Sequence, residues 1–440
     1  MTQLRRTLSL GSVVLFGIAY LTPIIVLGTF GILADATQGH VPAAYLAATI
    51  AMLLTAMSYA HMAAAYPVAG SAYTYVRKAI NPELGFLTGW AVLLDYLFLP
   101  MAIWLIGAAY LGSAFPSIPQ AVWVLAFIVI TTGINVIGLR LAKVINGGLM
   151  LVQLLVLTAF LALCVHYIGG DSSRPLWSLA PFFEPGIGLP LVMGGAAIAC
   201  YSFLGFDAVS TLTEETRDPA RTIPRAILLI TIIGGAIFIV SAYLVQLAHP
   251  GAKFENADSA AYEIARNIGG DVFVSIFVIG LIVGQFTSGL AAQASASRLL
   301  FAMGRDGVLP KALFGVLSER HGTPVGSIVM CGVVGLLALK LDVTTSTSFI
   351  NFGAFLAFSL VNLSVLLHYW VDKGQRGPRS VLVYLFCPLL GMVSTLWLMF
   401  SLDRMALILG ASWLALGVVY LAWVTGGFRR KPPQLHFEEA

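Results

Sequence analysis

The sequence predicts an all-α membrane protein with twelve transmembrane helices, and three observations support this prediction. The 440 residues are 59% hydrophobic and only 10% charged, and their mean hydropathy is +0.91. Soluble globular proteins are about 45–50% apolar and about 25% charged, so the bilayer must be the main solvent of this chain. The other two observations are the long apolar runs and the uneven distribution of Lys and Arg among the loops.

The apolar runs set the number of spans, because a transmembrane helix needs about 20 mostly apolar residues. We expect one polytopic membrane domain over residues 1–440. Its spans are expected near residues 12–34, 41–65, 84–113, 121–138, 146–168, 188–212, 225–248, 271–303, 324–340, 344–370, 381–401 and 405–425. The first run exceeds the apolar core of a signal peptide, about 7–15 residues, so we expect it to be a span.

The loop cations indicate the orientation of the chain, because cytoplasmic loops are enriched in Lys and Arg. With twelve spans, 19 of the 24 cations fall on one side and 5 on the other. The first group is Arg5, Arg6, Arg77, Lys78, Arg140, Lys143, Arg217, Arg221, Arg225, Arg298, Arg305, Lys311, Arg320, Lys373, Arg376, Arg379, Arg429, Arg430 and Lys431. The second group is Arg174, Lys253, Arg266, Lys340 and Arg404. Both termini are therefore expected in the cytoplasm.

Two spans contain helix-breaking segments near mid-membrane. The first span carries Ala19-Tyr20-Leu21-Thr22-Pro23, where Pro23 lacks an N–H and clashes with the preceding turn. The sixth carries Ser202-Phe203-Leu204-Gly205-Phe206-Asp207. Five spans separate the two breaks, so they occupy equivalent places in two five-span halves. Such paired breaks indicate the binding site of an inverted-repeat transporter, although Pro and Gly are common in membrane helices in general.

Asp95 and Asp207 are the only acidic residues well inside apolar spans. A carboxylate buried in the membrane costs several kcal/mol unless it finds a partner or takes a proton. No Lys or Arg lies deep in a span to pair with either. Each carboxyl is therefore expected to face a wet cavity, where it meets a cationic substrate or carries a proton. The alternative is a neutral carboxyl that hydrogen-bonds between helices.

The remaining polar residues of the spans are more ambiguous. Gln153 in the fifth span and Gln285, Thr287 and Ser288 in the eighth could line a cavity, or make interhelical hydrogen bonds of about 0.6 kcal/mol. The four cysteines, Cys164, Cys200, Cys331 and Cys387, are expected to be small buried hydrophobic residues. The sequence has no P-loop, HExxH, GxSxG or CxxC motif and no ligand-spaced His pair. We therefore expect no enzymatic activity, cofactor or metal.

Three segments resemble the amino acid–polyamine–organocation superfamily over nearly the whole chain. The first is Tyr66-Pro67-Val68-Ala69-Gly70-Ser71-Ala72-Tyr73-Thr74-Tyr75 with Gly85-Phe86 and Gly89-Trp90. The second is the sixth-span break with Glu214-Glu215-Thr216, Asp218-Pro219 and Ile223-Pro224. The third is Ser297-Arg298, Met303-Gly304-Arg305-Asp306-Gly307, Pro310 and Thr323-Pro324. The resemblance implies two intertwined five-helix repeats, residues 12–168 and 188–370, with two additional helices at 381–425.

Within the superfamily the chain is most similar to bacterial putrescine importers. This similarity is carried by Gly39-His40-Val41-Pro42, Ser71-Ala72-Tyr73-Thr74-Tyr75, Leu94-Asp95-Tyr96-Leu97-Phe98, Phe203-Leu204-Gly205-Phe206-Asp207-Ala208 and Asn351-Phe352-Gly353-Ala354. It implies proton-driven uptake across the bacterial inner membrane.

Three departures from the family pattern bear on the substrate. Amino-acid members usually carry a Gly-Ser/Ala-Gly triplet at the first break, which grips the substrate carboxylate, and here Leu21-Thr22-Pro23 stands there. Diamine importers place an Asp shortly after this break, where this chain has Gly28. Some proton-coupled relatives bear a Lys in the fifth span, at about the position of Gln153. The first departure favours a substrate without a carboxylate, and the second argues against assuming putrescine.

The leading hypothesis is proton-coupled import of putrescine or a related small amine, by rocking of one helix bundle against the other. Tyr20, Tyr96 and Tyr201 could offer cation–π faces worth about 0.5–2 kcal/mol each. Asp207 and Asp95 are the expected proton-coupling residues. The expected substrate-binding residues are Tyr20, Leu21, Thr22, Pro23, Asp95, Tyr96, Tyr201, Ser202, Gly205, Phe206, Asp207 and Gln285. The expected partners are the solute, protons and lipid, with no nucleic acid. An amino-acid permease, an amine exchanger and a membrane sensor remain alternatives.

Overall fold

The computed structural model describes residues 6–68, 70–137, 142–171, 175, 177–184, 187–305, 307–318 and 321–432. Within these ranges the chain is helical, and its only β-structure is an isolated bridge between Leu8 and Thr216. Some residues used above lie outside the described residues, namely the loop cations Arg5, Arg140, Arg174 and Arg320 and the motif residues Ala69 and Asp306.

Eleven helical segments of the described chain are long and apolar enough to cross a membrane, as expected for a multi-pass protein. Two of them, Leu10–Gly28 and Leu189–Thr213, each consist of more than one short helix. The others contain α4 (Val41–Ala65), α6 (Pro82–Ala114), α7 (Gln120–Ile137), α8 (Ala142–Gly169), α10 (Pro219–Ala248), α11 (Ala260–Arg305), α14 (Val343–Val365), α16 (Cys387–Phe400) and α17 (Arg404–Val424).

The ninth expected span corresponds to a shorter apolar segment, Val325–Leu339. It consists of α13 (Val325–Gly335) and a single 3₁₀ segment, η4 (Leu336–Leu339). The remaining short elements are α5 (Ser71–Ala79), η3 (Ala257–Ser259), α12 (Lys311–Phe314), η5 (Leu366–Asp372), α15 (Pro378–Ser380) and η6 (Val381–Phe386). Helix α11 is kinked at Gly270, whose left-handed φ of 70° and ψ of −172° are not helical, so two helices meet there.

The first apolar segment is interrupted between Leu21 and Ile25. Helix α1 (Leu10–Leu21) ends at Thr22, whose φ of 51° is left-handed. Pro23 follows, and α2 (Ile25–Gly28) and α3 (Phe30–Ala36) continue the chain. A left-handed residue followed by proline cannot continue an α-helix, so the backbone turns here.

The sixth apolar segment is also interrupted. Helix α9 (Leu189–Ala199) narrows into a 3₁₀ turn, η1 (Cys200–Phe203). Leu204 then becomes extended, with ψ of 128°, and Gly205 adopts a φ of 105° that favours glycine. The chain resumes as η2 (Ala208–Glu215), a second 3₁₀ segment. Backbone groups between Ala199 and Ala208 are thus outside any α-helix.

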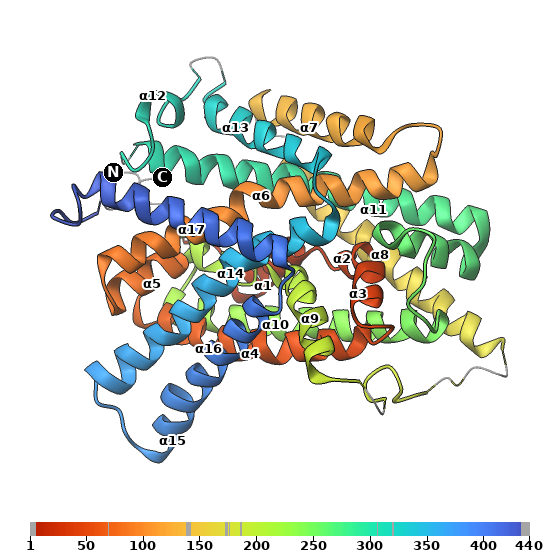
Figure 1. The fold of residues 1–440 in the computed structure, drawn as a ribbon, viewed down its shortest axis with the longest axis horizontal. Coiled ribbons are helices and arrows are strands. Elements are labelled where there is room, and N and C mark those ends of the chain that lie inside the picture. Colours follow the sequence, from red (N-terminus) through yellow and green to blue (C-terminus); the bar gives the residue numbers. More distant parts are fainter. Residues whose placement is uncertain are drawn as a thin grey trace.

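The helices that pack most extensively come in pairs five spans apart. Helix α4, the second span, packs along α10, the seventh, and α6, the third, packs along α11, the eighth. Helix α6 also packs along α14, and its apolar window is 83% buried. Figure 1 shows α6 and α11 running side by side through the middle of the molecule. Helix α6 is therefore the central helix against which the site is built.

The last two helices lie at the periphery, since the apolar windows of α16 and α17 are only 22% buried. Helix α17 is fixed to α6 by Trp90 and Trp413, each of which donates its indole N–H to the other's backbone carbonyl at 2.9 Å. Their rings stack with centroids 5.0 Å apart. Three of the four cysteines, Cys164, Cys200 and Cys331, are buried and unpaired as expected, whereas Cys387 is unpaired but partly exposed.

Candidate functional site

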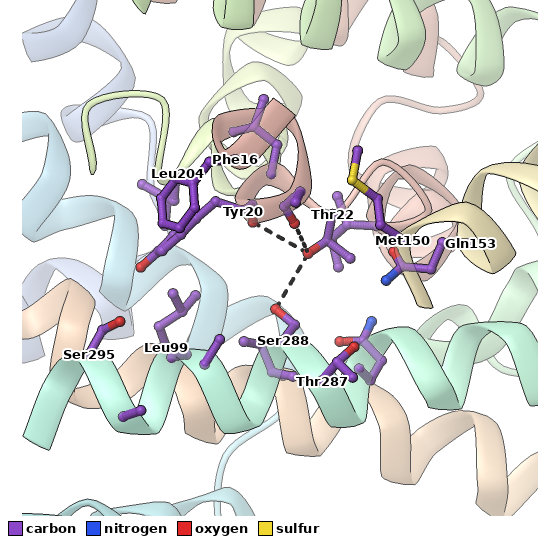
Figure 2. Close-up of a pocket in the computed structure, with 18 of the residues that line it drawn as sticks. Phe16, Tyr20, Thr22, Leu99, Met150, Gln153, Leu204, Thr287, Ser288 and Ser295 are labelled. Carbon is purple, nitrogen blue, oxygen red and sulfur yellow. Dashed lines mark hydrogen bonds between the residues drawn. The ribbon is translucent and has the colours of Figure 1, made fainter. Parts of the chain in front are cut away.

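A cavity of about 490 Å³ lies beside the first helix interruption. Its walls come from α1, α6, α8, α11 and the η1 segment. In Figure 2, Phe16, Tyr20 and Thr22 lie on one side and face Leu99 of α6 and Ser288 of α11 across the space. The cavity thus brings together segments from both halves of the chain.

One face of α11 forms a large part of the cavity wall. Gln285, Ser288, Ala292, Ser295 and Arg298 all line the cavity. They recur every three or four residues, which places them on the same side of an α-helix. The thirteen steps along the helix from Gln285 to Arg298, at about 1.5 Å each, make this wall about 20 Å long. The cavity is therefore an elongated channel, with Gln285 at its inner end and the exposed Arg298 at the other.

The hydroxyl of Thr22 links the interrupted first helix to α11. Its Oγ1 lies 3.4 Å from the carbonyl oxygen of Ala19, 3.3 Å from that of Tyr20 and 3.4 Å from Ser288 Oγ, and donates toward them (Figure 2). The left-handed backbone at Thr22 is thus held partly by its own side chain. The contact with Ser288 is long for a hydrogen bond between hydroxyls, so it is a weak one.

Tyr20 connects the two interruptions. Its ring lies so close to Gly205 that a Cβ at that position would be 1.9 Å from Tyr20 Cδ1. Only glycine fits there, both for this close approach and for the left-handed φ. Tyr20 and Tyr201 also line the cavity, and the hydroxyl of Tyr201 is buried with no hydrogen-bond partner among the described residues.

Asp95 and Asp207 lie within electrostatic range of Tyr20, although neither lines the cavity. Tyr20 is close enough to interact electrostatically with both Asp95 and Asp207, and the two carboxylates are close enough to interact with each other. Ser71 donates its hydroxyl to Asp207 Oδ2 at 3.4 Å, and Asp95 Oδ1 is buried with no partner in the described chain. This cluster has polar partners but no described cation within ion-pair distance.

The structure brings some of the sequence-predicted site residues together and gives others different surroundings. Those that line the cavity are Tyr20, Leu21, Thr22, Tyr201 and Gln285. Those that do not are Pro23, Asp95, Tyr96, Ser202, Gly205, Phe206 and Asp207.

Two of the residues outside the cavity have structural contacts instead. The hydroxyl of Ser202 shares a hydrogen bond of 2.9 Å with that of Tyr45, and both groups are buried. The ring of Phe206 packs edge-on against Tyr59, at 5.5 Å between centroids, and against Phe358 at 5.3 Å. These contacts tie the second interruption to α4 and α14.

Sequence reasoning missed much of the cavity wall. The missed residues are Ser12, Leu15, Phe16, Ala19, Ile25, Leu99, Ile103, Met150, Leu204, Ala291, Ala292, Ala294, Ser295 and Arg298. For α11 the signal was present, since small and polar residues recur at helical spacing from Gln285 to Arg298. Of the polar residues left open above, Gln153, Gln285, Thr287 and Ser288 all line the cavity, and Thr287 also donates to the carbonyl of Val283 at 2.8 Å.

Comparison with known families settles the class of this membrane protein. The sequence profile described as "Amino acid permease" matches residues 8–425. This chain belongs to the amino acid permease family. A low-affinity putrescine importer of Escherichia coli K12, PlaP, is 40% identical to the permease over 435 residues, which cover 98% of this chain and 96% of the relative.

More distant relatives of this permease differ in their named solutes. The branched-chain amino acid permease BcaP of Bacillus subtilis is 27% identical over 405 residues, covering 87% of this chain and 83% of the relative. The methylthioribose transporter of Bacillus subtilis is 27% identical over 452 residues, covering 95% and 93%. These matches span nearly the whole permease, so the family resemblance expected from the sequence is confirmed.

Proposed function

We propose that this permease is a proton-coupled importer of a small amine, such as putrescine, across the bacterial inner membrane. The observation that carries the proposal is the meeting of two interrupted helices at Tyr20 and Gly205, with two carboxylates and a 490 Å³ cavity beside them. Non-helical backbone at membrane depth is tolerated only where it is buried in protein or lines a water-filled cavity, and paired helix interruptions form the binding sites of many transporters. The 40% identity to a putrescine importer supports an amine as the solute.

The architecture proposed for transport has twelve spans in two five-helix repeats, residues 12–168 and 188–370, with two additional helices at 381–425. The ninth span is then the short segment Val325–Leu339. The close packing of α4 with α10 and of α6 with α11 supports this arrangement, because each pair is five spans apart. Alternating access then follows from rocking of one bundle against the other.

The state of the described structure is proposed to be open toward the cytoplasm. The cavity extends from the interruption toward Ser12, near the start of α1, and Arg298, near the end of α11. Both lie at span ends that the loop charges assign to the cytoplasm, together with both termini. A solute entering from outside would be released by this route.

Asp207 and Asp95 are proposed to carry the coupled proton. A carboxyl inside the membrane is stable when protonated, or when an ammonium ion lies beside it. An ammonium ion reaching Tyr20 would meet the fields of both carboxylates, and its arrival would favour release of a proton from one of them. Proton and substrate then move in a linked cycle.

Uptake into proteoliposomes tests the proposal. Radiolabelled putrescine is added outside vesicles that contain the purified permease, with and without an inward proton gradient. Gradient-stimulated accumulation is expected, and protein-free vesicles provide the background. An absence of stimulation by the gradient would reject proton coupling, and an absence of any specific uptake would reject this amine as the solute.

Amino-acid transport is the second candidate, and one observation favours it. The described residues that line the cavity include no carboxylate, and the one charged side chain among them is the cation Arg298. Such a lining is compatible with a carboxylate-bearing solute. Thermal stabilisation by neutral amino acids but not by diamines would favour this function. Counterflow of labelled amine against internal amino acid would indicate exchange instead.

A further inference from the structure

The inner end of the cavity is polar but uncharged. Gln153 and Gln285 line it, together with the hydroxyls of Thr22, Thr287 and Ser288. Gln153 packs against α11, since a Cβ on Gly284 would lie 3.0 Å from its Cδ. Hydroxyls and amides at the end of a cavity fix the orientation of a ligand through hydrogen bonds.

Gln285 has an unused hydrogen-bond donor at this end. Its side chain is 1% exposed, and its Nε2 has no hydrogen-bond partner among the described residues. A buried polar group without a partner is unfavourable, and in native proteins such groups are usually satisfied by water or a ligand. Gly28 lies beside this atom, since a Cβ on Gly28 would be 3.6 Å from Nε2, and Gly28 has no side chain that could accept the hydrogen bond.

Asp95 is too far away to serve this end, and none of the described residues that line the cavity is a carboxylate. A Cβ on Gly107 would lie 3.4 Å from Gln285 Cβ, so Gly107 marks the level of Gln285 on α6. Asp95 is twelve residues earlier on the same helix, which is about 18 Å along its axis. Five single bonds of about 1.5 Å join the nitrogens of putrescine, which therefore lie at most about 7 Å apart. A second ammonium at Gln285 would have no counter-charge.

We propose that Gln285 selects solutes whose inner end is a hydroxyl or carboxamide group, rather than a second ammonium. The amide donates to the acceptor oxygen of such a group, and Ser288, one turn away on α11, is available to the same group. The solute class is then a small monoamine with an uncharged hydrogen-bonding end. This inference rests on the proposed function, because it concerns the same cavity and the same amine.

The test compares three solutes of similar length: 1,4-diaminobutane, 4-aminobutan-1-ol and 4-aminobutanamide. Binding is measured by thermal stabilisation of the purified permease in lipid nanodiscs, and by competition with radiolabelled putrescine uptake. The wild type is expected to bind the alcohol and the amide about tenfold more tightly than the diamine, because the second ammonium of the diamine would be left without a partner. A preference for the diamine would overturn the proposal.

Substitution of Gln285 then makes the assignment specific. Gln285→Glu supplies a carboxylate and is expected to reverse the preference toward the diamine, whereas Gln285→Met is expected to abolish the preference. Gln120→Glu, the same change at an exposed residue that begins α7, is the matched control and should leave the order unchanged. If the Gln285→Glu variant keeps the wild-type order of affinities for the three solutes, the proposal is overturned. If that variant does not fold, an unchanged order of affinities in Gln285→Met overturns it.

The two proposals fail in different ways. If uptake is driven by the proton gradient but the Gln285 variants keep the wild-type order, only the role of Gln285 is rejected. If no solute is transported but the stabilisation order changes as expected, the transport function is rejected and the binding role stands. If none of the three solutes stabilises the wild type and none is taken up, both are rejected.

Discussion

The ring of Tyr20, at the end of α1, rests against the α-carbon of Gly205, in the interruption after η1. A Cβ at position 205 would lie only 1.9 Å from Tyr20 Cδ1. No amino acid other than glycine therefore fits there unless the ring of Tyr20 moves. The contact joins the two interrupted segments at one point, with the cavity on one side of the ring and two carboxylates close by. A displacement of either segment is therefore transmitted to the other through Tyr20.

Gly205→Ala should abolish uptake and lower thermal stability. The left-handed backbone disfavours alanine by about 1–2 kcal/mol, and the overlap with Tyr20 adds to this. Melting temperature and putrescine uptake are the measurements. Gly194→Ala is the control, because Gly194 lies in helix α9 with no atom within 4 Å of the added Cβ. Equal activity of the two variants would show that the contact is dispensable.

Asp207→Asn should separate binding from proton coupling. An asparagine keeps the size of the side chain but cannot exchange a proton, so uptake is expected to lose its stimulation by an inward proton gradient. Exchange of labelled for unlabelled solute across the vesicle membrane should persist. Asp35→Asn, at an exposed aspartate in α3, is the control. Full gradient stimulation in Asp207→Asn would remove this residue from the coupling mechanism.

The spans were predictable because hydropathy is a local property. The segments expected near 41–65 and 405–425 match α4 (Val41–Ala65) and α17 (Arg404–Val424) to within one residue at each end. Both interruptions coincide with the segments that contain Pro23 and Gly205, whose backbone restrictions are also local.

The surroundings of individual side chains were less predictable, because they depend on which helix face meets which neighbour. Ser202 was expected at the substrate, yet its hydroxyl bonds to Tyr45, which is 157 positions away in the chain. Asp95 was expected to face a wet cavity, whereas the cavity wall on α6 begins one turn later, at Leu99. Which face of a helix meets the cavity is set by packing against its neighbours, and the composition of the span does not reveal it.

Trp413→Phe should lower stability with little effect on solute preference. The change removes the hydrogen bond from Trp413 Nε1 to the carbonyl of Trp90 and weakens the ring stack between α17 and α6. The expected loss is about 0.5–1.5 kcal/mol for the hydrogen bond, seen as a lower melting temperature in nanodiscs. Trp423→Phe is the control on the same helix, since Trp423 is 76% exposed. A similar loss in both would mean that the reciprocal bonds contribute nothing specific.

Gly28→Asp should increase the affinity for diamines. The Cβ of the new side chain would make ordinary contacts of 3.4 Å with Ile106 and Ile25 and would lie 3.6 Å from Gln285 Nε2, which puts the new carboxylate beside this amide. The amide can then donate to the carboxylate, which in turn supplies a counter-charge for a second ammonium at the inner end of the cavity.

This gain is expected to be specific to the charge of the solute. Binding of 1,4-diaminobutane should tighten about tenfold, as for a charge-assisted hydrogen bond, while binding of 4-aminobutan-1-ol stays equal or weakens. Without ligand the buried carboxylate should lower the melting temperature, and the diamine should restore it. Gly28→Ala is the matched control, because it adds the Cβ without the charge. If the aspartate and alanine variants bind the diamine equally, the inner end of the cavity does not contact the solute, and the binding position must lie nearer Tyr20.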